Sequence, residues 1–206
     1  MKHLFKSILA GMMISIGGCV YLSLDNKILG AIFFGIGLFS VVTYNFNLYT
    51  GKIGYLVNNF NLKYIKELII TLIGNFIGTF FVGFILRYTR IYTLLFAKAK
   101  SLVAIKLNDS IISILILSFL CGLLMYFAVN GYKTINDMGK YLAVFLGVIV
   151  FILCGFEHCV ANMFYFTVAK SFSVNAIFYM GCMIIGNSLG GVFIPLCDLV
   201  INNPKK

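Results

Sequence analysis

Six long apolar blocks run along the chain and constrain its fold more than any other feature. They span Ser7–Leu24, Ile28–Val57, Leu68–Leu86, Ser110–Val129, Tyr141–Val168 and Ala176–Ile201. A helix of roughly 20 apolar residues crosses the hydrocarbon core of a bilayer. Lipid tolerates only backbone whose polar groups are paired within helices or closed barrels. The pattern therefore predicts an all-α membrane protein with six transmembrane helices.

The composition supports a membrane setting. Apolar residues occupy 61% of the 206 positions and charged residues 11%, and the mean hydropathy is +1.02. A soluble chain of this length would lack the polar surface to cover so apolar a sequence. The sequence contains no phosphate-binding loop, which argues against ATP-driven transport. Its basic residues flank the apolar blocks instead of forming a patch, which argues against nucleic-acid binding.

The two halves of the sequence resemble each other at a nearly constant offset. IGNFIG at 73–78 matches IGNSLG at 185–190, and the stretch 46–51 matches 156–161. Because the repeated unit holds three apolar blocks, the second copy is expected to be inverted in the membrane, as in many transporters. We interpret the chain as a single transmembrane domain, residues 1–206. It comprises repeat one at about 1–90, an amphipathic connector at about 91–108 and repeat two at about 109–206.

The second and fifth blocks are longer than one span, and both carry polar residues near their centres. The second holds Asn47, Thr50 and Lys52, and the fifth holds Glu157 and His158. Ionisable groups at membrane depth are costly and mark transport paths or proton relays. Non-helical backbone is tolerated there only where it is buried in protein or lines a cavity. We therefore expect both helices to break and the breaks to face each other. The alternatives are a short polar loop between helices and a purely structural Glu–His pair.

Five motifs give the chain a family resemblance. They are GFEHCVANMF at 155–164, LYTGK at 48–52, LAGMMISIGG at 9–18, IGNFIG around Asn75 and GNSLGG at 186–191. On these motifs the whole chain resembles the formate/nitrite transporter family. The resemblance implies an aquaporin-like protomer of two inverted three-helix repeats, with spans 2 and 5 broken, assembled as a homopentamer without a cofactor. Within the family the chain looks most similar to clostridial hydrosulfide channels, in its short termini and its Asn-, Ile- and Lys-rich composition.

The resemblance also implies roles for individual residues. The pore and selectivity positions are His158, Thr50, Leu48, Tyr49, Phe34, Leu38 and Phe151. Glu157 and Asn162 match loop-anchoring positions, and we expect Glu157 to accept hydrogen bonds from backbone N–H groups. The basic residues matched to the pore mouths are Lys6 and Lys140. Lys52 stands where many members have asparagine, so it adds a positive charge near the break. No metal site is expected, because Cys154, His158 and Cys159 lack a fourth ligand.

The resemblance further implies passage of a small monovalent weak-acid anion, with hydrosulfide expected first and formate or nitrite as other cargo. An anion in an apolar constriction loses its water at a large cost, and basic residues at the mouths raise its local concentration. Histidine titrates near neutral pH, so His158 could protonate the anion or hydrogen-bond to it. This suits hydrosulfide, whose conjugate acid also titrates near neutral pH. The alternatives are a proton-coupled secondary transporter that uses His158, and a membrane enzyme with Glu157 and His158 as acid and base.

The segment Arg87–Lys106 mixes basic and apolar residues. That composition is typical of an amphipathic segment on the membrane surface, and we expect a lipid-contacting connector, with a gate as the alternative. Basic residues are nearly balanced between the two sides of the membrane, so the positive-inside rule does not decide the orientation. The expected location is the inner (cytoplasmic) cell membrane, which the chain would cross several times.

Overall fold

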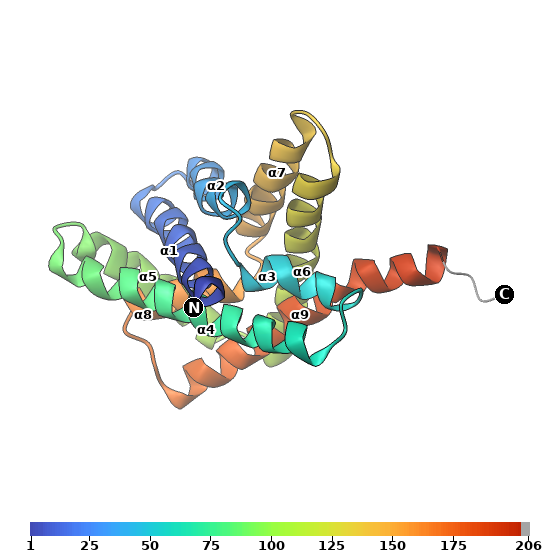
Figure 1. The fold of residues 1–206 in the computed structure, drawn as a ribbon. Coiled ribbons are helices and arrows are strands. Elements are labelled where there is room, and N and C mark those ends of the chain that lie inside the picture. The colour runs from blue at the N-terminus through green and yellow to red at the C-terminus, as the bar shows by residue number, and fades with distance from the viewer. Residues whose placement is uncertain (203–206) are drawn as a thin grey trace.

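The computed structural model describes residues 1–202, and every regular element in that range is helical (Figure 1). In chain order the elements are α1 (Lys2–Ser23), α2 (Lys27–Thr43), α3 (Tyr49–Lys52), η1 (Ile53–Leu56), α4 (Leu62–Ile85), η2 (Leu86–Tyr88), α5 (Tyr92–Leu107), α6 (Ile111–Thr134), α7 (Gly139–Leu153), α8 (Cys159–Val168) and α9 (Val174–Asn202). The last four residues assigned to repeat two, 203–206, lie outside the described residues.

Four segments are long and apolar enough to cross a bilayer by themselves: α1, α4 continued by η2, α6 and α9. The two longest apolar blocks of the sequence contain shorter helices. The second block holds α2, α3 and η1, and the fifth holds α7 and α8. The helix interruption expected from the polar residues is therefore present in both blocks, at 44–48 and at 154–158.

The two interruptions share one backbone geometry. The chain leaves α2 through Asn45, which has a φ of 57°, and leaves α7 through Gly155, which has a φ of 71°. In each case the N–H of the next residue bonds the carbonyl oxygen five positions before it, at 2.9 Å and 2.8 Å respectively. This left-handed closure is a common helix ending, and asparagine and glycine adopt it at low steric cost. The same local chemistry thus ends the helix at corresponding points of both halves.

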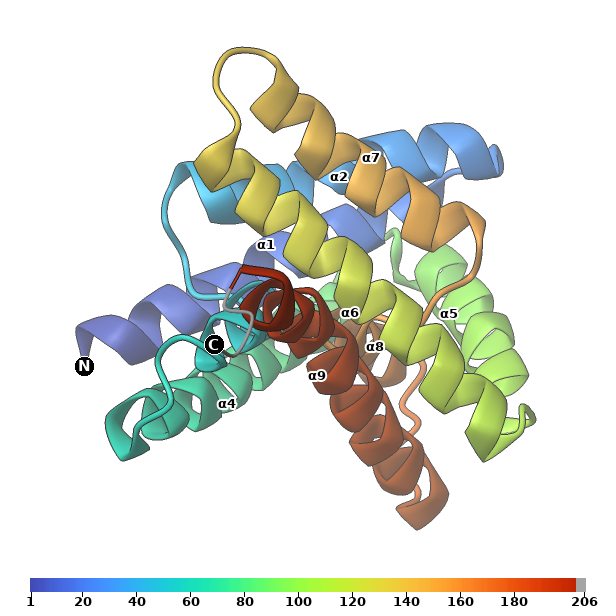
Figure 2. The ribbon, with the colours of Figure 1, turned by 90° about the vertical axis from the view of Figure 1, so that its right-hand side faces the viewer.

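Each half of the protein is built around one close helix crossing. α1 packs on α4 and α2, α6 packs on α9 and α7, and α2 packs against α7 (Figures 1 and 2). A Cβ added to Gly78 of α4 would strike the Ile8 carbonyl oxygen of α1. One added to Gly190 of α9 would strike the Phe119 carbonyl oxygen of α6. Small residues allow such approaches between apolar helices, so the two glycines hold corresponding places in the two halves.

The connector between the halves is the helix α5, which packs against α8 and α1. Its buried positions are Leu95, Ala99, Val103 and Lys106. They recur at the spacing of one helix face, while Leu94 remains largely exposed. The connector expected on the membrane surface therefore has one side buried in the protomer. Lys106, at the end of that side, points into the protein.

Candidate functional site

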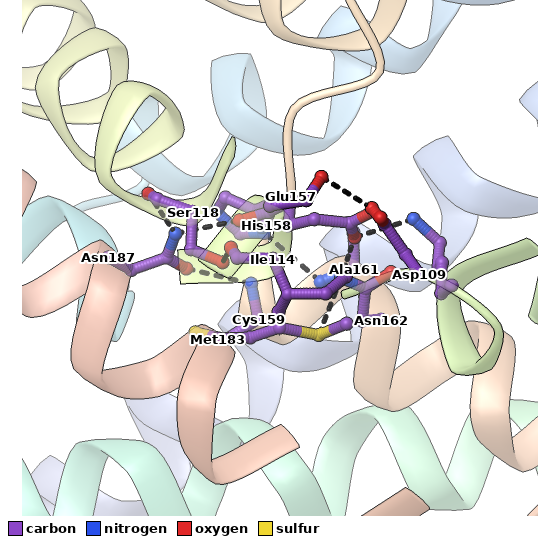
Figure 3. A network of polar contacts seen from close by, with 12 residues as sticks. Asp109, Ile114, Ser118, Glu157, His158, Cys159, Ala161, Asn162, Met183 and Asn187 are labelled. Carbon is purple, nitrogen blue, oxygen red and sulfur yellow. Dashed lines mark hydrogen bonds and ion pairs between the residues drawn. The ribbon is translucent and has the colours of Figure 1, made fainter. Parts of the chain in front are cut away.

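Asn187 on α9 holds the second interruption in place. Its side-chain oxygen accepts the N–H of Cys159, the first residue of α8, at 2.8 Å. Its amide nitrogen donates to the carbonyl oxygens of Ser118 on α6 and of Glu157, both at 2.7 Å (Figure 3). The amide is fully buried and makes all three of these bonds, so it fixes the geometry of the groups around it. The start of α8 is thereby tied to both long helices of its half.

Asn75 on α4 makes the same set of bonds at the first interruption. Its oxygen accepts the N–H of Tyr49, the first residue of α3, at 2.9 Å. Its nitrogen donates to the carbonyl oxygens of Ser7 at 2.7 Å and of Asn47 at 2.8 Å. The sequence repeat IGNxxG carried the signal for both asparagines, because a polar residue recurred between packing glycines. The family motif around Asn75 does not by itself predict these bonds.

His158 lies where the two interruptions meet. It is 2% exposed, and its Nε2 lies 2.9 Å from the Thr50 hydroxyl. Its Nδ1 accepts the N–H of Ala161 at 3.0 Å, which caps the start of α8. A nitrogen that accepts an N–H carries no proton, so in this arrangement the ring is neutral and the hydrogen sits on Nε2. Nε2–H therefore donates to Thr50, and protonating Nδ1 would set two N–H groups against each other.

Two phenylalanines bring apolar rings to this histidine. The ring of Phe151 on α7 stacks on the His158 ring, with centroids 5.5 Å apart and an interplanar angle of 25°. Phe34 on α2 meets Phe151 edge-on, with centroids 5.7 Å apart and an angle of 89°. Leu38 and Leu48 are 1% and 2% exposed in the same apolar core. The protein therefore surrounds its central polar pair with tightly packed apolar groups.

Cavities border the central pair on two sides. One of about 410 Å³ is lined by Leu48 and Lys52, which flank Thr50 in the chain, together with Lys133. A small one of about 50 Å³ is lined by His158 itself. The hydrogen bond between Thr50 and His158 thus lies between the linings of the two cavities.

Within residues 1–202, the Glu157 carboxylate accepts hydrogen bonds from side chains and not from the backbone N–H groups that the sequence interpretation predicts. It accepts Lys106 Nζ at 2.6 Å and Asn162 Nδ2 at 2.7 Å. The side chains of Lys106 and Glu157 are only 9% and 5% exposed. Losing either partner of a buried pair leaves an uncompensated charge, which is strongly destabilising. The pair therefore ties α5 to the second interruption.

Sequence reasoning missed Lys106 because it grouped the residue with the basic residues of a surface connector. A signal was present in the sequence. Lys106 continues the apolar helix face that includes Ala99 and Val103, so the lysine belonged to the buried side. The Nζ of Lys140, which the family resemblance suggests for a pore mouth, lies 5.0 Å from the Tyr141 ring centroid. Lys140 lines neither of the two cavities at the central pair.

The remaining candidate positions are spread around the first interruption. Lys6 Nζ donates to the Asn45 carbonyl oxygen at 3.1 Å, so it supports the left-handed turn. Lys52 lies in the wall of the 410 Å³ cavity, as expected for a charge near the break. The Tyr49 hydroxyl shares a hydrogen bond with Ser188 on α9 at 2.8 Å. Tyr49 thus extends to α9 and does not line either cavity beside the central pair.

A model of the family described as "Formate/nitrite transporter" matches residues 1–200. The chain belongs to the formate/nitrite transporter family. It is similar to a formate-nitrite transporter of Entamoeba histolytica, with 26% identity over 98% of this chain and 65% of that protein. It is also similar to the formate channel FocA of Haemophilus influenzae, with 26% identity over 79% of this chain and 66% of that protein. The chain spans about two thirds of the length of these two relatives.

Solved structures of the family share the fold. A pentameric formate channel with formate bound has a TM-score of 0.79 and 23% identity, covering 98% of this chain and 96% of that chain. An FNT family ion channel has a TM-score of 0.84 and 22% identity, covering 98% of this chain and 90% of that chain. With its apolar helices and its family membership, the protein is a multi-pass membrane protein.

Proposed function

We propose that this family member is a channel for small monovalent weak-acid anions, with hydrosulfide as its main cargo and formate or nitrite also carried. The observation that supports this most is the buried hydrogen bond between His158 and Thr50. The two residues place an N–H and an O–H between the linings of two cavities. Neutral donors in a dry site stabilise an anion without trapping it as a fixed charge would.

The apolar groups beside the pair supply the selectivity in this proposal. Phe34 and Phe151 meet at His158, and Leu38 and Leu48 are buried in the same core. A narrow apolar passage excludes hydrated ions because removing their water is costly. Only an anion that loses its water readily, or takes up a proton, crosses such a passage. Hydrosulfide meets this condition because its conjugate acid titrates near neutral pH.

In this proposal the lysines near the 410 Å³ cavity attract anions to the entrance of the pore. Lys52 and Lys133 both line the cavity, and Lys133 Nζ lies 3.9 Å from the Tyr55 ring centroid. Positive charge in a cleft with low-dielectric walls raises the local anion concentration. The chain carries a net charge of +10, which acts in the same direction.

We further propose six spans arranged as two inverted three-helix repeats, with spans 2 and 5 broken and one pore in each protomer of a homopentamer in the cytoplasmic membrane. The matched bonds of Asn75 and Asn187 support the repeats. The likeness to a pentameric formate channel supports the assembly. Inverted repeats with discontinuous helices place their sites near the midplane, where this proposal puts His158.

A proton-coupled anion transporter is the second candidate. It is favoured by the position of His158, whose ring lines the 50 Å³ cavity and could exchange a proton with a bound anion. Flux in liposomes that carry the purified protein separates the two. Hydrosulfide, formate, nitrite and chloride are each applied as a gradient while internal pH and membrane potential are recorded.

A channel passes the weak-acid anions down their gradients without a matching proton current, and hydrosulfide moves fastest and chloride slowest. Strict one-to-one movement of protons with the anion would favour the transporter. Flux no greater than in protein-free liposomes for all four anions would refute both.

A further inference from the structure

The small cavity beside His158 is a neighbour of a larger outer cavity. Tyr21 and Leu102 line both the 50 Å³ cavity and a third cavity of about 340 Å³. The third cavity also includes Asp25, whose side chain is 98% exposed, and therefore reaches the protein surface. A volume of 50 Å³ exceeds what a single water molecule needs. An anion arriving from this surface would occupy the small cavity before it reaches His158.

Tyr165 on α8 lines this cavity and has no hydrogen-bond partner among residues 1–202. The side chain is only 6% exposed. Within that range the single fully covered side-chain nitrogen or oxygen without a partner is Arg87 Nε. The Tyr165 hydroxyl, which has no partner either, therefore borders open space, and the cavity that it lines is the one beside His158. Buried tyrosine hydroxyls usually find a partner.

The ring of Tyr165 is held firmly. A Cβ added to Gly18 of α1 would come within 3.4 Å of the Tyr165 ring, so α1 packs directly against it. Tyr21, also on α1, faces it with ring centroids 6.4 Å apart. The Tyr21 hydroxyl likewise has no hydrogen-bond partner among the residues that the structure describes. Tyr165 and Tyr21 thus both contribute to the wall of this small cavity, and Tyr21 also lines the outer cavity.

We propose that the hydroxyls of Tyr165 and Tyr21 donate hydrogen bonds to the permeating anion in this cavity, and so discriminate between anions before they reach His158. This proposal rests on the proposed channel function. The hydroxyls replace water as the anion is stripped of its shell and moves toward Phe151. They supply donors where the remaining lining is largely apolar.

The chemical class that this site favours is a small oxyanion, such as a carboxylate or nitrite of a few heavy atoms. An O–H donates a short, charge-assisted hydrogen bond to an anionic oxygen. Sulfur is a weaker acceptor. Formate and nitrite therefore gain more from the two tyrosines than hydrosulfide does. On this account the tyrosines widen the range of cargo by supporting the anions that are hardest to protonate.

The test compares Tyr165→Phe and Tyr21→Phe with the unmodified protein in liposomes, with formate and hydrosulfide measured in the same preparations. Anion concentrations are kept below half-saturation, so that flux reports the barrier. We expect Tyr165→Phe to lower formate flux about tenfold, the loss of one hydrogen bond to a charged group. Hydrosulfide flux should fall by less than about threefold, because sulfur accepts more weakly. Tyr88→Phe is the matched control, since Tyr88 is 80% exposed and lines neither cavity.

Each outcome is decisive. A lower formate-to-hydrosulfide flux ratio in Tyr165→Phe, with no change in Tyr88→Phe, supports the proposal, and a higher ratio contradicts it. An unchanged ratio overturns it, whether both fluxes persist or fall together, because a merely structural role affects both anions alike. If Tyr165→Phe does not assemble, the formate-to-hydrosulfide flux ratio of Tyr21→Phe is measured in its place and judged in the same way. Absence of flux for both anions in the unmodified protein would instead refute the channel function, and the tyrosine site with it.

Discussion

Replacing Lys106 with methionine should destabilise the protein strongly. The change removes the only cation that contacts the Glu157 carboxylate among the described residues, while Asn162 remains its one side-chain donor. The two charged side chains are 9% and 5% exposed, so a carboxylate left without its cation stays largely removed from bulk water. Breaking a buried ion pair from one side costs about 3–5 kcal/mol. On the scale of soluble domains of this length, that corresponds to a thermal midpoint lower by roughly 10 °C.

The assay is thermal unfolding of the purified protein in detergent, followed by the loss of the assembled species. The matched control is Lys98→Met on the same helix, whose pair with Asp25 is exposed and should shift the midpoint far less. The double variant Lys106→Met with Glu157→Gln removes both charges and should recover most of the loss. A midpoint for Lys106→Met equal to that of the Lys98 control would refute the buried-pair reasoning.

Three other outcomes are expected. Leu48→Ala combined with Phe151→Ala should pass chloride in planar bilayers while either single change does not, because two apolar barriers act in series; equal leakage in a single variant would contradict this. Asn187→Ala should lower the thermal midpoint, since it leaves the buried Cys159 N–H unpaired, at about 1–3 kcal/mol, and removes the bonds to two carbonyl oxygens; an unchanged midpoint would count against its anchoring role. The hydrogen bond and charge of Lys98 hold the pKa of Asp25 below its ordinary value of 3.8. The difference in thermal midpoint between the unmodified protein and Asp25→Asn should therefore be present above pH 3.8 and vanish as the pH falls through the lowered pKa of Asp25. A difference that persists in acid would rule this out.

Much of the architecture could be predicted from local chemistry. Polar residues inside apolar blocks two and five predicted the helix interruptions, because such residues are costly in lipid. The offset between the halves predicted that the interruptions correspond, and Asn45 and Gly155 share the left-handed geometry. The positions of α3 and α8 within the longer blocks could not be predicted residue by residue. They depend on Asn75 and Asn187, which lie far away in the sequence and bond to the first residue of each short helix.

The polar site could be predicted only in part. The motif around His158 pointed to the residue, and the structure adds its bond to Thr50, which is 108 positions away in the sequence. The partner of Glu157 could not be deduced, because composition describes α5 as a basic connector and does not show which side faces the protein. The two tyrosines of the small cavity carried no motif at all. Their place depends on how α1 packs against α8, which only the three-dimensional arrangement reveals.

The most direct test of the channel account is hydrosulfide flux into liposomes that carry the unmodified protein or its His158→Phe and His158→Asn variants. Asparagine can still cap α8, so the second variant separates the imidazole chemistry from the bond to Ala161. The account predicts rapid flux for the unmodified protein, none for His158→Phe and strongly reduced flux for His158→Asn, with all three assembling alike. Flux in both assembled variants equal to that of the unmodified protein would contradict the central place given to His158.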